Sequence, residues 1–152
     1  MSEEPPGIDV TTEATIRRPR AEVAAYAANP DNAPTWYANI RSVQWKTAPP
    51  LAVGSALEFV ARFLGASMAY TYEVIDYRPG ERLVMRTTDG PFPMETTYTW
   101  RDAGDTATEM TLRNRGEPDR FSKLSAPLVA RAVRRANRKD LARLRSILER
   151  SG

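Results

Sequence analysis

Chemistry in this chain has to come from carboxylate, tyrosine, lysine or arginine side chains, from backbone amides or from a bound cofactor. The reason is that its 152 residues include no His and no Cys. Imidazole is the commonest general base and metal ligand, and thiolate is a frequent nucleophile and iron–sulfur ligand. Serine-type triads, thiolate catalysis, zinc hydrolysis and disulfide bonds are therefore excluded, and we expect no cofactor and no metal site.

The carboxylates mostly occupy the polar positions of segments in which apolar and polar residues alternate. Four of them fall opposite the apolar positions, namely Glu58, Glu73, Glu95 and Glu109. Only Asp76 shares an apolar phase, near the end of its segment. The paired buried carboxylates that acid–base catalysis commonly uses are not visible. The sequence therefore favours binding over strong catalysis.

Tyrosine and arginine remain as weaker candidates for chemistry. Tyr70, Tyr72 and Tyr98 could orient or protonate a carbonyl group. Arg86 could stabilise an enolate, but the phase of its short segment is ambiguous. A tyrosine hydroxyl with its ordinary pKa of ~10 is a poor base at neutral pH. No residue is assigned a catalytic role on this basis.

The elements that must position these side chains are mainly strands. Alternation with β-branched and aromatic residues, which is typical of half-buried strands, predicts about seven of them. They cover residues 8–17, 41–47, 56–64, 68–77, 83–88, 94–100 and 108–114. Two short helices are predicted after the first strand, at residues 19–29 and 31–37. Short turns between the later strands, such as Pro79-Gly80, indicate antiparallel neighbours.

The C-terminal part of the chain changes to a helical period. Its apolar residues recur at spacings of three to five and predict one long helix. They are Phe121, Leu124, Leu128, Ala132, Val133, Ala136, Leu141, Leu144 and Leu148. Pro127 marks either a kink or the true start of this helix.

An antiparallel sheet must bury one apolar face, and this long helix is available to cover it. A strongly curved sheet wrapped around a helix is not always filled by side chains, so we expect a cavity between them. Ala132 and Ala136 would leave room there, although Ala is also simply a good helix former.

Local patterns in this order resemble the START-like, helix-grip (SRPBCC) superfamily, and within it the small polyketide cyclase/dehydrase-like proteins. The patterns are residues 16–23 (IRRPRAEV), 29–31 (NPD) followed by Trp36-Tyr37, 79–83 (PGERL) and 140–144 (DLARL). The resemblance covers residues 8–150, which we expect to form one domain after a disordered tail at residues 1–7. It implies an α+β helix-grip fold, a curved antiparallel sheet of about seven strands around a long C-terminal helix.

The same resemblance implies a deep apolar cavity for lipids, sterols, polyketide intermediates or other hydrophobic molecules. The superfamily includes carriers, ligand sensors and cyclases without a shared catalytic motif, so no catalytic residue is carried over. Binding of a lipid- or polyketide-like molecule is the first hypothesis, and a cyclase or dehydratase acting in the same cavity is the alternative.

If the apolar phases point inward, the cavity lining follows from the sequence. Aromatic residues and methionines with a few polar points would suit a flat or polycyclic ligand. The predicted ligand-binding residues are Trp36, Tyr37, Phe59, Phe63, Met68, Tyr70, Tyr72, Thr96, Tyr98, Met110, Asn114, Leu128, Ala132 and Asn137, with Leu112 in the same phase. The alternative is that these side chains pack a filled core.

A second possible binding surface is basic. The net charge is +3, but residues 113–152 carry 12 Lys and Arg against 4 Asp and Glu. On the long helix five arginines lie opposite the apolar stripe: Arg131, Arg134, Arg135, Arg138 and Arg145. This face could bind an anionic membrane or an acidic protein transiently. No RNA-binding motif, helix-turn-helix or zinc ligand set accompanies it, so nucleic acid is a weaker candidate. A solvated face is the simplest alternative.

Targeting signals are not evident. The first residues are acidic and proline-rich, without the basic and then apolar run of a signal peptide. The most apolar window, residues 51–70, is interrupted by Glu58 and Arg62 and does not predict a transmembrane helix. We expect a cytoplasmic protein.

Overall fold

The computed structural model describes residues 7–63, 65–90, 93–116 and 126–150. These residues form seven strands, three α-helices and one 3₁₀ turn. The strands are β1 (Ile8–Ile16), β2 (Ile40–Trp45), β3 (Ala56–Phe63), β4 (Ala66–Arg78), β5 (Arg82–Asp89), β6 (Met94–Asp102) and β7 (Thr108–Gly116). The helical elements are α1 (Arg20–Ala28), η1 (Pro30–Asn32), α2 (Ala33–Trp36) and α3 (Ala126–Arg150). This order confirms the one predicted from the sequence.

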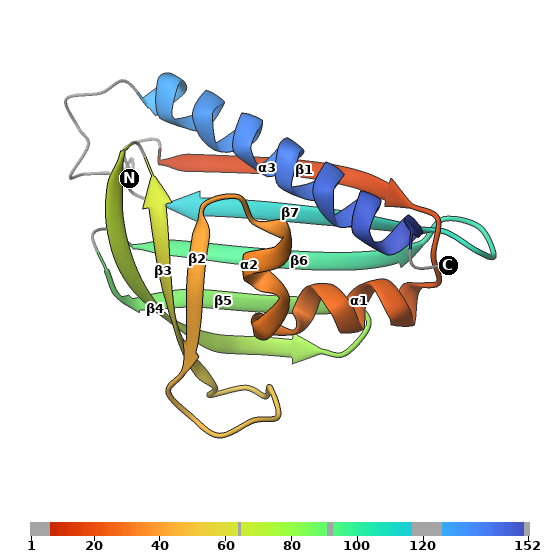
Figure 1. The fold of residues 1–152 in the computed structure, drawn as a ribbon, viewed down its shortest axis with the longest axis horizontal. Coiled ribbons are helices and arrows are strands. Elements are labelled where there is room, and N and C mark those ends of the chain that lie inside the picture. Colours follow the sequence, from red (N-terminus) through yellow and green to blue (C-terminus); the bar gives the residue numbers. More distant parts are fainter. Residues whose placement is uncertain (1–6, 64, 91–92, 117–125, 151–152) are drawn as a thin grey trace, which may run out of the picture.

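The seven strands form one sheet in the order β1-β7-β6-β5-β4-β3-β2. Every neighbouring pair is antiparallel, and β1 returns to pair with β7 along its whole length. β2 and β3 stand across the ends of the other strands, so the sheet is strongly curved, and α3 crosses in front of β1 and β7 (Figure 1). This is the curved sheet with a long C-terminal helix that the resemblance implies.

The strand phases place the predicted apolar face inward. In β6, Thr96, Tyr98 and Trp100 are all less than 9% exposed, and in β7 Met110 and Leu112 are fully buried. Successive side chains of a strand point to opposite faces of the sheet, so the buried residues of a strand also identify which of its other side chains point outward. The alternation therefore predicted these two central strands correctly.

The inward stripe of α3 differs from the predicted one. Pro127 lies in the first turn, so it marks the start of the helix and not a kink. Leu128 is 59% exposed, whereas Val129 and Val133 are buried. The buried positions repeat at spacings of three and four through Asn137, Asp140, Leu141, Leu144 and Leu148. Asn137 and Asp140 thus belong to the inner face of α3, so a stripe chosen from apolar residues alone does not coincide with that face. Phe121 and Leu124 lie outside the described residues.

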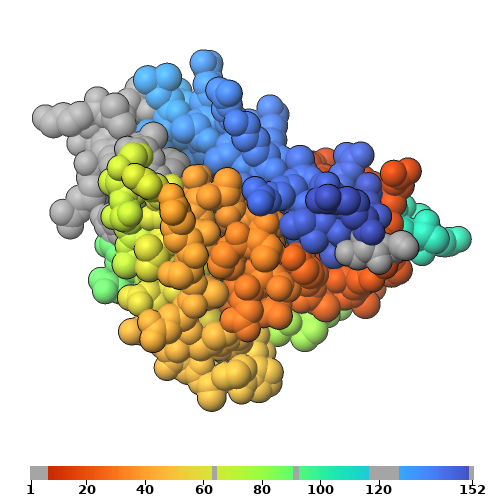
Figure 2. All heavy atoms as spheres, viewed as in Figure 1, coloured from red at the N-terminus to blue at the C-terminus, as the bar shows by residue number. Residues whose placement is uncertain are grey.

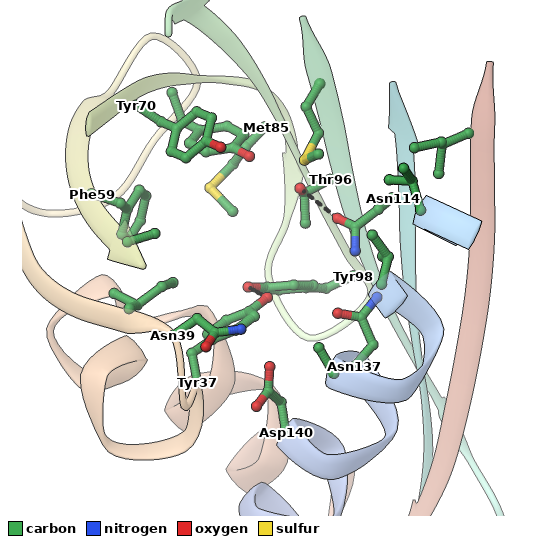
Figure 3. Close-up of a pocket in the computed structure, with 18 residues that line it drawn as sticks. Tyr37, Asn39, Phe59, Tyr70, Met85, Thr96, Tyr98, Asn114, Asn137 and Asp140 are labelled. Atoms are coloured by element: carbon green, nitrogen blue, oxygen red, sulfur yellow. Dashed lines mark hydrogen bonds between the residues drawn. The ribbon is translucent and has the colours of Figure 1, made fainter. Parts of the chain in front are cut away.

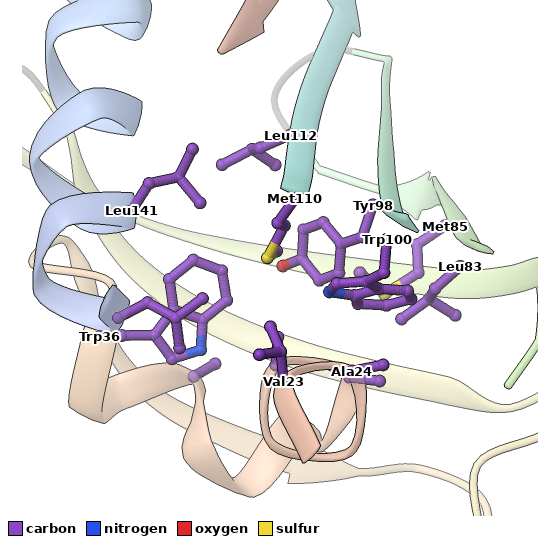
Figure 4. Packing of buried hydrophobic residues seen from close by; sticks show 14 of the residues in the cluster. Val23, Ala24, Trp36, Leu83, Met85, Tyr98, Trp100, Met110, Leu112 and Leu141 are labelled. Carbon is purple, nitrogen blue, oxygen red and sulfur yellow. The ribbon is translucent and has the colours of Figure 1, made fainter. Parts of the chain in front are cut away.

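The interior is divided along α3. Near α1 and α2 the space between helix and sheet is filled by a core that includes Trp36, Trp100, Met110 and Leu141, all at most 2% exposed (Figure 4). The N-terminal half of α3 faces a different region, described below. Among the residues that the structure describes, no helix is both long enough and apolar enough to cross a membrane.

Candidate ligand-binding cavity

A cavity of about 160 Å³ lies between the curved sheet and the N-terminal half of α3. Protein interiors usually leave few voids larger than a water molecule, so a volume of this size stands out. The cavity is lined by Ile8, Tyr37, Asn39, Ile40, Phe59, Ala61, Tyr70, Tyr72, Met85, Met94, Thr96, Tyr98, Asn114, Val129, Val133, Ala136, Asn137 and Asp140 (Figure 3).

One side of the cavity is an aromatic wall formed by Phe59, Tyr70 and Tyr72. The ring of Phe59 meets that of Tyr72 edge to face with centroids 5.7 Å apart, and Tyr70 and Tyr72 follow at 6.3 Å. The Tyr70 hydroxyl donates to the sulfur of Met68 at 3.1 Å. β3 and β4 supply these side chains from directly paired positions, Phe59 opposite Tyr70 and Leu57 opposite Tyr72. The wall offers flat apolar surface to a ring-shaped ligand.

Two tyrosine hydroxyls meet at the other side. Tyr37, at the end of α2, and Tyr98, in β6, have their hydroxyl oxygens 2.6 Å apart. Burial raises the pKa of both hydroxyls well above the ordinary value, and it raises the pKa of Tyr72 to about 12. These groups therefore stay protonated at neutral pH. The Tyr37–Tyr98 pair uses one of its two hydroxyl hydrogens internally and has a second available for another acceptor.

Asp140 places a carboxylate in this cavity. It projects from α3, is only 3% exposed, and its carboxylate points into the cavity (Figure 3). Its Oδ1 accepts a hydrogen bond from the Ala38 backbone N–H at 3.0 Å. Burial raises the pKa of Asp140 to about 6, although the Ala38 hydrogen bond and Arg143 act in the opposite direction. The carboxyl group can therefore change its charge near neutral pH.

Three further polar side chains lie nearby. Thr96 donates to Oδ1 of Asn114 at 2.9 Å, so these two residues largely satisfy each other. Asn137 is 5% exposed, and its Nδ2 has no hydrogen-bond partner among the described residues. A buried amide without a partner costs free energy. It is therefore a group that a ligand could satisfy.

Eight of the predicted ligand-binding residues line the cavity. They are Tyr37, Phe59, Tyr70, Tyr72, Thr96, Tyr98, Asn114 and Asn137. Most of them lie on strands, where the alternation of apolar and polar residues in the sequence predicted which side chains point inward.

The other predicted residues lie elsewhere. Trp36, Met110 and Leu112 are fully buried in the packed core near α1 and α2, because the inward face of the sheet is longer than the cavity. Met68 accepts the Tyr70 hydroxyl hydrogen bond but is not a lining residue, Leu128 is 59% exposed, and Ala132 is one turn from the lining residue Ala136. The side chain of Phe63 lies outside the described residues.

Asp140 is the charged cavity-lining residue that the sequence analysis missed. Its spacing from Val133 and Asn137 puts it on the inner face of α3, but a search for apolar stripes passes over polar residues. Asp76, the one carboxylate predicted to face inward, follows a bulge in β4 and pairs with Arg82 at 2.7 Å outside the cavity. Arg86, whose phase was ambiguous, is exposed.

Asn39, Ile40, Met85 and Met94 also line the cavity without having been predicted. Asn39 and Ile40 come from a loop and the start of an edge strand, where tertiary packing and not periodicity sets the orientation. Within the described residues no group of three or more carboxylates lies close enough to bind a metal ion.

The five arginines of the basic face lie on the other side of α3. Arg131, Arg135, Arg138 and Arg145 are exposed and Arg134 is half-buried. α3 forms a ridge on the surface of the molecule (Figure 2), so this face is accessible there. Contact with an anionic membrane or an acidic protein stays a prediction.

Known proteins share both sequence features and architecture with this chain. Residues 7–149 match the family model described as polyketide cyclase/dehydrase and lipid transport. No curated protein sequence matches the chain.

Several solved structures have the same fold. A START superfamily protein from Mycobacterium smegmatis superposes with a TM-score of 0.81 at 13% identity, covering 95% of this chain and 99% of its own. The Zhui aromatase/cyclase from a Streptomyces species gives 0.75 at 17% identity, with 95% and 94% covered. A major latex-like protein from Panax ginseng gives 0.71 at 14% identity, with 95% and 97% covered. At such identities the likeness concerns the fold alone.

Proposed function

The chain belongs to the polyketide cyclase/dehydrase and lipid transport family, and from that premise we propose that it binds a compact, ring-containing apolar molecule between the sheet and α3. The single observation that carries this proposal is the cavity of about 160 Å³ with an aromatic wall on one side and hydrogen-bonding groups on the other. Most ligand pockets combine such apolar surface with a few polar groups that orient the ligand.

The volume of the cavity limits the size of the ligand. A cavity of about 150 Å³ lined by apolar side chains accommodates a benzene-sized molecule. The space here, about 160 Å³, is therefore suited to a body of one or two rings. A sterol or a long acyl chain would require the lining to move. Among the lipid- and polyketide-like ligands that the family suggests, we favour the aromatic ones.

Titration with a neutral fluorescent probe tests this proposal. 1-Aminonaphthalene, a two-ring amine that is uncharged at pH 7.5, should bind saturably with one site per chain, and its emission should shift to shorter wavelength on transfer from water into the cavity. One- and two-ring aromatic hydrocarbons should displace it, whereas cholesterol and palmitic acid should displace it at least tenfold less well. Absence of saturable binding by a folded protein would contradict the proposal.

A second candidate function, an enzyme of the cyclase or dehydratase type, is favoured by one specific observation. Asp140 combines burial in the cavity with a pKa raised to about 6, which is close to the value that suits a general acid or base at neutral pH. Its carboxylate could take a proton from a carbon beside a ketone, the enolate carbon could attack a second ketone to close a ring, and the carboxyl group could return the proton to the new alkoxide. A second proton taken from the same carbon and passed to the new hydroxyl would let it leave as water, with formation of a carbon–carbon double bond. The Tyr37–Tyr98 pair could donate to the ketone oxygen.

Turnover separates this candidate from pure binding. A linear poly-β-ketone should be converted to an aromatic ring product, detectable by absorbance, with a rate that rises as the pH increases through about 6 and Asp140 ionises. A substrate that binds but returns unchanged over hours across this pH range would leave binding as the function.

A further inference from the structure

Five polar side chains that line the cavity lie at one end of it, away from Tyr70 and Met85 (Figure 3). We call this the polar end and define it as Tyr37, Asn39, Tyr98, Asn137 and Asp140. Its members come from the α2–β2 connection, from β6 and from α3, so it exists only in the folded chain. Among the cavity-lining residues that the structure describes, Asp140 alone has a side chain that is charged at neutral pH.

The carboxylate of Asp140 has acceptor capacity to spare. A carboxylate offers about four acceptor positions, and the structure records one hydrogen bond to it, from Ala38 N–H at 3.0 Å. No Lys or Arg is among the lining residues that the structure describes, and no ion pair to Asp140 is found there. A buried charge without a counter-charge is costly. Arg143 acts on Asp140 from outside the cavity lining, so within the cavity the carboxylate has free acceptor positions and no cation bonded to it.

Two aromatic side chains share the polar end with Asp140 (Figure 3). Tyr37 and Tyr98 both line the cavity, and their ring centroids lie 4.1 and 5.9 Å from that of Trp36. The charge of Asp140 contributes to the raised pKa of both tyrosine hydroxyls. Aromatic faces attract ammonium groups, especially where water is excluded. A carboxylate among tyrosines is thus complementary to an organic cation.

Resting on the proposed function, we propose that the ligand carries a protonated amine that binds Asp140 at the polar end, while its ring body lies against the aromatic wall. An N⁺–H···O⁻ hydrogen bond supplies both the donor and the counter-charge that the carboxylate lacks. A ligand hydroxyl would supply only the donor. A ligand carboxylate would place two like charges together in a site of low polarity, which disfavours binding.

A matched series of ligands tests the charge preference. Four ligands share the naphthalene ring system and differ only in the group at the end of a two-carbon side chain. They are 2-(1-naphthyl)ethylamine, 2-(1-naphthyl)ethanol, 1-ethylnaphthalene and 1-naphthaleneacetic acid. Each is used to displace 1-aminonaphthalene at pH 7.5. The amine is expected to bind at least tenfold more tightly than the alcohol, and the acid is expected to bind most weakly.

Variants at two aspartates locate the effect. Asp140→Asn is expected to remove the difference between amine and alcohol, because the amide keeps the shape but not the charge. Asp105→Asn, at an exposed turn between β6 and β7, is the matched control and should keep the full preference.

The pH dependence of binding gives a further test. The groups that act on Asp140 are Ala38 N–H, Arg143 and the Tyr37 and Tyr98 hydroxyls. Burial raises the pKa of Asp140 to about 6, so amine affinity should fall below pH 6, where the carboxyl group becomes neutral, while alcohol affinity stays level.

The possible outcomes distinguish the two proposals. If the series displaces the probe but the amine binds no more tightly than the alcohol, the amine inference is wrong and the proposed function stands. An amine preference that survives Asp140→Asn also overturns the inference. If neither the probe nor any member of the series binds, the proposed function itself fails.

Discussion

Ala136→Phe is expected to abolish binding of 1-aminonaphthalene and of other two-ring aromatics while leaving the protein folded. Ala136 lies on α3 and lines the cavity. A phenyl ring added there occupies much of the volume of about 160 Å³, which is close to the size of a cavity that holds one benzene ring. Displacement titration should show at least a hundredfold loss of affinity.

The stability of this variant should move in the opposite direction to its binding. Filling an existing cavity adds apolar contacts without creating strain if the ring fits, and such changes commonly add about 0.5–2 kcal/mol to the free energy of unfolding. Urea unfolding followed by tryptophan fluorescence measures this. Loss of binding together with unchanged or higher stability would show that the ligand and the introduced ring compete for one space.

Ala132→Phe is the matched control. It makes the same substitution one turn earlier on the same helix, at a half-buried position outside the cavity lining. Probe affinity should change by less than threefold. Equal loss of binding in both variants would mean that the helix, and not the cavity, responds to the added ring, and retained binding in Ala136→Phe would place the ligand site elsewhere.

The strands could be predicted from the sequence because their inward faces obey a strict alternation. In β6 and β7, every second residue is buried, so Thr96, Tyr98 and Asn114 could be assigned to the interior from their neighbours alone. A phase error in such a strand would expose a whole apolar face, and this is why the assignment is robust. The boundary between packed core and cavity is not encoded in that pattern, since Met110 and Asn114 share one face of β7 but lie in different regions.

The inner face of α3 was predicted less well for a physical reason. Its buried positions follow the helical period but include two polar residues: Asn137, which was predicted beside the stripe, and Asp140, which was not predicted. Sequences agree with their folds at most positions, and local disagreement is commonest at functional sites. The polar residues at 137 and 140 are such a disagreement, and the cavity explains it.

Asp140→Asn is expected to stabilise the folded protein at pH 7.5 by about 1–3 kcal/mol. Burial raises the pKa of this carboxyl from 3.8 to about 6, and each pKa unit corresponds to about 1.4 kcal/mol between the two protonation states. The folded state therefore binds a proton more tightly than the unfolded state. The resulting stabilisation is fully present below about pH 4, is lost as the pH rises through about 6, and is absent at pH 7.5. Asparagine keeps the acceptor for Ala38 N–H without the buried charge.

The stabilising effect of Asp140→Asn should depend on pH. The difference in unfolding free energy between Asp140→Asn and the unmodified protein should be largest above pH 7 and should shrink toward zero near pH 4, where Asp140 is protonated. The exposed control Asp105→Asn should differ by less than about 0.5 kcal/mol throughout. A destabilised Asp140→Asn at pH 7.5 would mean that the carboxylate is paired inside the folded protein. A stabilised variant would mean that the chain retains a costly charge at this position, and such a cost is expected where stability is given up for function.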